Sequence, residues 1–180
     1  MKKILIAYFS HEGENLVDDE IVTLKKGNTQ IAAEELGSRL EAKGFKPLLF
    51  RIEEMIPYPY EYDATLARSR QEKEDGAMPL INDGPNNFEL YDIVFLGFPN
   101  WWGTIPAPIL SFLRGHDFSG KKVIPFITHG GQDFLYSLDT IKAELPGIEV
   151  IKGFACAAAY ISSANHVIAS FLEENKGILD

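Results

Sequence analysis

The stretch Tyr8–Leu36 reads YFSHEGENLVDDEIVTLKKGNTQIAAEEL, and it combines two features that belong together. Ser10 follows a short apolar run, and residues 27–29 (GNT) open a segment with helical spacing. The free N–H groups of a helix N-terminus and a nearby hydroxyl suit a bound phosphate. The intervening residues 11–26 are rich in acidic side chains, which raises the question of how the two halves meet.

The helix start alone does not identify a phosphate site, because Asn28 or Thr29 would also serve as an ordinary helix cap. The Walker pattern GxxxxGK and the dinucleotide pattern GxGxxG are both absent from the sequence. This fragment by itself therefore leaves both interpretations open.

Short apolar segments bounded by turn signals indicate a buried sheet. The segments 4–9, 92–98 and 122–128 are continuous apolar runs, which suit strands covered on both faces. The segments 46–52 and 148–157 are weaker candidates of the same kind. Together they predict five parallel strands.

Helical patterns alternate with these strands. They cover residues 28–44, 106–115, 134–147 and 163–177, and a further helix is expected over 62–74 inside a region rich in Pro, Gly and Asn. Alternating strands and helices predict an α/β fold with helices on both faces of a parallel sheet. At 180 residues, we expect a single domain over 1–180.

Composition and charge exclude several functional classes. The net charge of −9 argues against nucleic acid, because phosphate backbones require clustered Lys and Arg. Cys156 is the only cysteine, so we expect no disulfide, no metal site and a reducing, cytoplasmic compartment. The apolar run that ends before Ser10 is too short for a membrane span or a signal peptide, so no membrane association is expected.

Two adjacent tryptophans follow the segment 92–98. In an open parallel sheet, ligands bind beyond the carboxyl ends of the strands, where these loops lie. The loop PNWWGTIPAP is rich in turn residues, so Trp101 and Trp102 cannot both point into one core. At least one indole is expected to line a cleft and pack against a planar ligand. The alternative is that both indoles cover the edge of the sheet.

The loop after segment 122–128 is polar and rich in glycine. Gly130 and Gly131 allow a ligand to approach the backbone closely, and Thr128 and His129 add polar groups. His129 is a candidate general acid, although a structural hydrogen bond is the simpler interpretation. Loops of this kind after neighbouring strands jointly predict a ligand site.

These pieces resemble the flavodoxin-like flavoproteins, in the branch of the flavodoxin family with a longer first loop. The matching motifs are ILIAYFS, GNTQIAAEEL, YPYEYDATLARSRQE, GFPNWWGTIPAPILSFL and ITHGGQDFLYSLDTIKAELPGIEVIKGFA, which span nearly the whole chain. The resemblance implies a flavodoxin-like three-layer sandwich with a five-stranded parallel sheet in the order 2-1-3-4-5, which is the order known for flavodoxin. It also implies flavin mononucleotide (FMN) as the cofactor.

The resemblance assigns a role to each loop by position. Ser10, Asn28 and Thr29 would hold the phosphate, Pro99, Asn100, Trp101, Trp102 and Gly103 would border the isoalloxazine ring, and Thr128, His129, Gly130 and Gly131 would close its other side.

The usual phosphate loop of the family is one compact run, whereas here it is split. We predict that residues 11–26 make an excursion that leaves and returns beside the phosphate. Carboxylates beside a phosphate dianion would be repelled, so the acidic residues of the excursion should face solvent or a partner. These residues are Glu12, Glu14, Asp18, Asp19 and Glu20.

The resemblance favours an FMN-binding electron-transfer protein, with a redox partner protein or a small-molecule electron acceptor. An acidic surface near the ring would disfavour the anionic reduced flavin and lower its potential. The alternative is an NAD(P)H-dependent quinone or flavin oxidoreductase on the same fold, with Tyr58, Tyr60, Tyr62 and His129 around the second substrate. A third class is a binding module that has lost its flavin.

Several further residues receive structural interpretations. Arg68, Arg70, Lys73 and Glu74 are expected on a solvated helix face. Cys156 lies in an apolar segment and is expected to be a buried small hydrophobe. The sequence leaves monomer and homodimer open.

Overall fold

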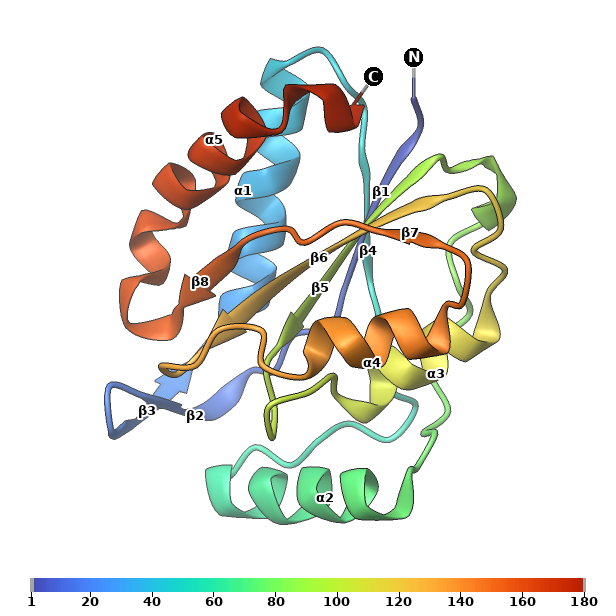
Figure 1. The fold of residues 1–180 in the computed structure, drawn as a ribbon. Coiled ribbons are helices and arrows are strands. Elements are labelled where there is room, and N and C mark those ends of the chain that lie inside the picture. The colour runs from blue at the N-terminus through green and yellow to red at the C-terminus, as the bar shows by residue number, and fades with distance from the viewer. Residues whose placement is uncertain (1, 180) are drawn as a thin grey trace.

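A parallel sheet forms the centre of the molecule in the computed structural model, which describes residues 2–179 (Figure 1). The strands lie in the spatial order β4-β1-β5-β6-β7, and β8 also pairs with β6. Their bounds are β1 Ile4–Tyr8, β4 Leu48–Arg51, β5 Ile93–Pro99, β6 Lys122–His129, β7 Glu149–Val150 and β8 Ala155–Ala157. Strands β4, β1, β5 and β6 correspond to the predicted strands 2, 1, 3 and 4, and β7 and β8 together form the predicted strand 5 at the edge. The predicted flavodoxin-like order 2-1-3-4-5 is therefore confirmed.

The edge strand predicted as one run over 148–157 is divided in two, which corrects that prediction. The register of β8 against β6 is shifted relative to that of β7. Pro125 in β6 has no N–H to donate, so the ladder is interrupted at its level. Gly153 crosses this break, and its N–H donates to the Pro125 carbonyl oxygen at 3.1 Å.

Helices cover both faces of the sheet, which gives the predicted three layers (Figure 1). Helices α1 (Asn28–Ala42) and α5 (Ala164–Glu174) cover one face, and α3 (Ala107–Gly115) and α4 (Ser137–Glu144) cover the other. Helix α2 (Tyr62–Asp75) lies beyond the sheet, and short 3-10 helices span Phe88–Leu90, Ala158–Ser163 and Lys176–Leu179. None of the helices within residues 2–179 is long and apolar enough to cross a membrane.

The predicted helix over 62–74 is α2, but the helix predicted over 134–147 begins later, at Ser137. Phe134 is buried in the core, and Leu135 adopts a left-handed backbone with φ of 42°. These residues form a turn that carries the chain from the glycine-rich loop into α4.

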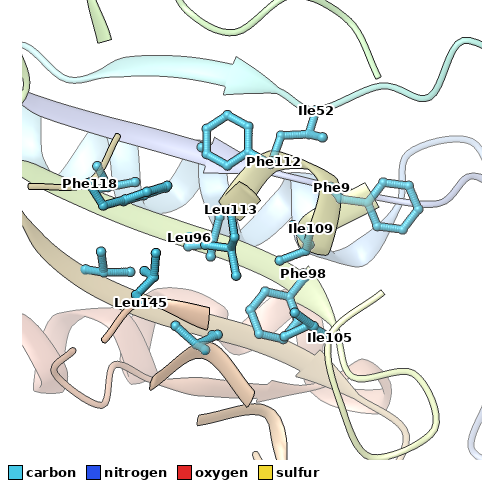
Figure 2. Close-up of a cluster of buried hydrophobic side chains, with 14 of the residues drawn as sticks. Phe9, Ile52, Leu96, Phe98, Ile105, Ile109, Phe112, Leu113, Phe118 and Leu145 are labelled. Carbon is cyan, nitrogen blue, oxygen red and sulfur yellow. The ribbon is translucent and has the colours of Figure 1, made fainter. Parts of the chain in front are cut away.

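Two hydrophobic clusters fill the spaces on either side of the sheet. Alternate residues of β1 enter different clusters, so that Leu5 and Ala7 face α3 and α4 while Ile4 and Ile6 face α1 and α5. Figure 2 shows the first cluster, in which side chains from the sheet meet those of α3, including Phe112. Burial on both faces explains why the strands read as continuous apolar runs.

The acidic excursion forms a β-hairpin, which the sequence analysis did not predict. Its antiparallel strands are β2 (Gly13–Val17) and β3 (Glu20–Leu24). Asp18 and Asp19 form the turn with φ of 53° and 63°, a left-handed pair that suits a tight hairpin. The hairpin projects beside the ends of the central strands (Figure 1).

Candidate functional site

A cleft of about 260 Å³ opens where β1, β5 and β6 end, at the sheet edge that the sequence predicted. The predicted residues that line it are Ser10, Asn28, Thr29, Pro99, Asn100, Trp101, Trp102, Thr128, His129 and Gly130. Gly103 and Gly131 lie outside this lining set. The structure therefore brings three loops distant in sequence to one place.

The two halves of the split loop meet at the start of α1. Ser10 is buried, and its Oγ accepts a hydrogen bond from the backbone N–H of Gln30 at 3.1 Å. A Cβ on Gly27 would lie 2.2 Å from that Oγ, so only glycine allows this approach. Residues 11–26 thus leave and return at one point, as predicted, and the phosphate beside that point stays a prediction.

A pair of hydroxyls joins α1 to the central sheet. Thr29 Oγ1 and Thr128 Oγ1 lie 2.8 Å apart, and both residues are buried. Asn28 and Thr29 are the first residues of α1, where backbone N–H groups have no partner within the helix. The floor of the cleft thus combines hydroxyls with the positive end of a helix dipole.

The two tryptophans diverge, as predicted from their turn-rich loop. Trp101 packs edge-on against Phe9 and Tyr58, with ring centroids 5.3 and 5.1 Å away. Trp102 has φ of 56°, and its Nε1 donates to Ser69 Oγ on α2 at 3.1 Å. Both tryptophan residues line the cleft, and Trp101 also packs against the hydrophobic cluster on the α3 and α4 side of the sheet.

The face of α2 that was predicted to be solvated is exposed at Arg70, Lys73 and Glu74 and half-buried at Arg68. The Arg68 guanidinium lies over the Tyr58 ring and donates to the Pro57 carbonyl at 2.8 Å. Lys73 Nζ donates to the Trp102 carbonyl at 3.0 Å, and the Arg70 guanidinium lies over the Trp102 indole. Arg70 and Lys73 thus hold the tryptophan loop against α2, and Arg68 holds the segment at Pro57 and Tyr58.

Sequence reasoning named Tyr62 as a contact of a second substrate but missed the rest of the face of α2 that lines the cleft. This face consists of Tyr62, Thr65, Leu66 and Ser69. Their spacing of three and four residues places them on one side of a helix, and it is the signal that could have identified them.

The hairpin also contributes to the lining, through Glu14, Asn15 and Leu16. Glu14 corrects the expectation that every acidic residue of the excursion faces solvent, because it is half-buried and its Oε2 accepts from the Tyr62 N–H at 2.9 Å. The other acidic residues of the excursion, among them Glu12, are exposed as predicted.

Comparison with known proteins identifies the family of the chain. The flavodoxin family model matches residues 3–174 of the chain. The chain belongs to the flavodoxin family. No curated protein sequence matches it.

Solved structures of similar fold include flavoproteins and an oxidoreductase. A protein described as a flavoprotein from Bacteroides eggerthii is 30% identical, with a TM-score of 0.73 over 97% of this chain and 98% of that one. A Lactobacillus acidophilus flavoprotein in complex with FMN is 20% identical, with a TM-score of 0.65 over 91% and 97%. An NADH:FMN oxidoreductase is 14% identical, with a TM-score of 0.54 over 96% and 90%. The last two likenesses show the fold alone.

Two histidines line the cleft, and the sequence analysis identified one of them. His129 Nδ1 accepts a hydrogen bond from the Gly131 N–H at 3.1 Å, which is the simpler structural role expected for it. Burial lowers the pKa of His129. His11 was missed, and its pKa is lowered chiefly by burial, while the neighbouring Glu12 acts in the opposite direction. Both rings are therefore neutral near pH 7.

The tyrosines suggested for a second substrate lie in different places. Tyr62 lines the cleft. Tyr58 is buried beneath Trp101, and its hydroxyl donates to Glu72. Tyr60 is exposed, with its hydroxyl 3.3 Å from Thr23 on the hairpin. Tyr62 alone of the three is thus placed to contact a ligand in the cleft.

Proposed function

We propose that the protein binds FMN in this cleft and acts in electron transfer. The observation that carries the proposal is the juxtaposition, in a flavodoxin-family chain, of a hydroxyl-bearing helix N-terminus and a tryptophan loop in one cleft. The first suits a phosphate and the second suits a planar ring, and FMN contains both.

The residues at the start of α1 fit a phosphate group. Ser10, Asn28 and Thr29 would hold it through hydroxyl, amide and backbone N–H groups. The close approach of Gly27 to Ser10 keeps these donors together, which supports a built site in preference to a plain helix cap. Glu12, Asp18, Asp19 and Glu20 are exposed and lie outside the lining of the cleft, whereas Glu14 lines it with its carboxylate bound to the Tyr62 N–H.

The tryptophan loop and the loop after β6 fit the ring of the flavin. Trp101 and Trp102 would border it, and Asn100, Thr128 and His129 would supply polar contacts. Bound FMN would supply the redox chemistry. The protein side chains would orient it, exclude water and set its potential.

A redox partner protein with a basic surface is the partner that we propose first. The hairpin beside the cleft presents the exposed acidic residues Asp18, Asp19 and Glu20. Leu16 and Ile21 pair across the hairpin and are both exposed, which adds apolar surface. Such a surface favours steering of a basic partner. A small-molecule electron acceptor is the alternative, and the acting species would be a monomer or a homodimer in the cytoplasm.

A second candidate function is an NAD(P)H-dependent oxidoreductase. The observation that favours it is the lining from α2, where Tyr62, Thr65 and Ser69 extend the cleft beyond the flavodoxin loops. This face could contact a nicotinamide or a quinone. The two proposals share FMN and differ in the second reactant.

FMN titration followed by flavin fluorescence tests the shared proposal. Replacing Trp101 and Trp102 by alanine should weaken binding several-fold, because each aromatic contact contributes about 0.5–1.5 kcal/mol. Phenylalanine at both positions is the matched control and should retain most of the affinity. Unchanged affinity in the alanine variant would remove both indoles from the site, and no binding by the native chain would overturn the proposal.

Anaerobic addition of NADH or NADPH to the FMN-loaded protein separates the two functions. A carrier should oxidise either nucleotide very slowly unless a separate reductase is present. Rapid oxidation by the protein alone, coupled to reduction of a quinone, would favour the oxidoreductase.

A further inference from the structure

The inserted hairpin separates the two halves of the split phosphate loop along the chain, so contacts in the folded structure hold them together. The departing half contains Ser10 and Glu12, and the returning half begins at Gly27 and continues into α1. Arg51, the last residue of β4, lies beside both halves. It pairs with Tyr8 at the end of β1, directly before the loop departs.

One guanidinium contacts both halves. Arg51 Nη1 donates to Glu12 Oε1 at 2.7 Å, and Arg51 Nη2 lies 3.4 Å from the Ser10 carbonyl oxygen. On the returning half, Arg51 Nη1 lies 3.4 Å from Gln30 Oε1. Gln30 is also the residue whose backbone N–H donates to Ser10 Oγ. The arginine therefore bridges the same two segments that form the proposed phosphate contacts.

The electrostatic surroundings favour a positioning role over a direct role. Glu12 forms a short ion pair with Arg51, and Glu53 lies 3.5 Å from its Nε. Two carboxylates thus offset the positive charge. Within residues 2–179, Arg51 Nε is a buried side-chain nitrogen with no hydrogen-bond partner. The Glu53 contact is an ion pair without the geometry of a hydrogen bond, so Nε stays an unsatisfied donor, which costs stability. The contacts that Nη1 and Nη2 make with the loop explain why the guanidinium keeps this orientation.

We propose that Arg51 is a positioning residue that clamps the split loop and sets the geometry of the phosphate cradle. A planar guanidinium can reach three acceptors at once, whereas an ammonium group is a point donor. Removing Arg51 should therefore release Ser10 and Glu12 from α1 while leaving the ring-binding loops intact. The expected consequence of the clamp is selectivity for a phosphorylated flavin, and this consequence rests on the proposed function.

Affinities for FMN and for riboflavin, which lacks the phosphate, measure that consequence. Arg51→Met should weaken FMN binding by about tenfold or more, as expected when hydrogen bonds to a charged group are lost, and change riboflavin binding by less than about twofold. Arg51→Lys should lose nearly as much FMN affinity as Arg51→Met, since it keeps the charge and loses the bridge. Wild-type FMN affinity in Arg51→Lys would overturn the clamp and leave only a charge effect.

Two further variants keep the test independent of folding. Gln30→Ala removes the contact on the returning half, together with the hydrogen bond that Gln30 Nε2 donates to Glu34, at a helix position that tolerates alanine. It should weaken FMN binding by a smaller factor than Arg51→Met. Arg39→Met is the matched control, because it removes a similarly exposed arginine whose ion pair with Glu35 on α1 lies outside the loop, and FMN affinity should stay unchanged. Equal FMN affinities in Gln30→Ala and the native chain would contradict the clamp.

Hydrogen exchange of the Gln30 amide, measured by NMR without any flavin, separates the clamp from the proposed function. This N–H donates to Ser10 Oγ, so it should exchange about tenfold faster in Arg51→Met if the clamp is lost. Unchanged exchange would overturn the inference even where FMN binds. Faster exchange in a protein that binds no FMN would support the clamp and overturn the proposed function.

Discussion

At the residue scale, Gly27 shows how one missing side chain permits the site to form. Its backbone has φ of −66°, which any residue adopts, so the requirement for glycine is steric. A Cβ would lie 2.2 Å from Ser10 Oγ and 2.4 Å from the His11 carbonyl oxygen. The second contact is with backbone, which cannot move aside as a flexible side chain can.

Gly27→Ala should therefore destabilise the protein and separate the halves of the split loop. We expect the free energy of unfolding to fall by about 1–3 kcal/mol, as for other overpacked positions, and FMN affinity to fall with it. Chemical denaturation and flavin titration measure the two effects. Gly115→Ala is the control, because a Cβ there would meet nothing within 4 Å. Equal stability of the two variants would contradict the steric argument.

The cleft histidines give a second prediction at this scale, on pH. Burial lowers the pKa of both His11 and His129 below the ordinary value of 6.5. The unfolded chain then binds more protons than the folded chain at acidic pH, so stability rises with pH through this region. Unfolding should become easier as the pH falls below about 6.5.

NMR titration of the imidazole resonances measures these pKa values directly. Midpoints at or above 6.5 for both rings would contradict the burial argument. The variant with glutamine in place of His11 and His129 should show a weaker dependence of unfolding free energy on pH between about 5 and 7 than the native chain.

At the scale of elements, the inserted hairpin acts as a support for α2. Glu14 on β2 accepts from the Tyr62 N–H at the first residue of α2, and the Glu14 N–H donates to the Tyr60 carbonyl oxygen at 2.9 Å. The carboxylate also lies at the positive end of the α2 dipole. Through Ser69, α2 in turn holds Trp102. The hairpin thus stabilises a wall of the cleft.

Glu14→Ala should loosen this wall. We expect a loss of about 1–2 kcal/mol in unfolding free energy, because a charged acceptor is removed from a helix N-terminus. Glu14→Gln keeps a carbonyl acceptor and should lose less. Glu20→Ala, on the exposed side of the hairpin, should change the stability by under about 0.5 kcal/mol in denaturant titrations. A loss at Glu20 as large as that at Glu14 would refute the support role.

At the scale of the whole molecule, two cores enclose the sheet, and Cys156 reports on one of them. It is 2% exposed in the cluster that joins the sheet to α1 and α5, which confirms its expected role as a small buried hydrophobe. Burial raises the pKa of its thiol to about 11. Since the thiolate is the reactive form, the native thiol should be nearly inert.

Alkylation by iodoacetamide at pH 8 should be at least about a hundredfold slower in the native protein than in denaturant, because burial suppresses both access and thiolate formation. The residual native rate should follow opening of this core. Comparable rates in the two conditions would show that the core between the sheet and α5 is open in solution.

The sequence by itself determined the layered fold and the location of the cleft. Runs such as residues 4–9 and 92–98 are apolar throughout because both faces of the sheet are covered, and this is a local property that sequence displays. The loops at Trp101 and Gly130 follow such strands, so their meeting at one edge followed from parallel topology.

Only the tertiary structure decided the details that depend on contacts between distant segments. The division of the edge strand follows from Pro125 on a neighbouring strand, and the role of Glu14 follows from its distance to α2. Arg51 lies in a weak strand pattern that indicates nothing about the loop it contacts. These interactions join residues far apart in the chain, and packing of the folded chain, rather than local sequence pattern, brings them together.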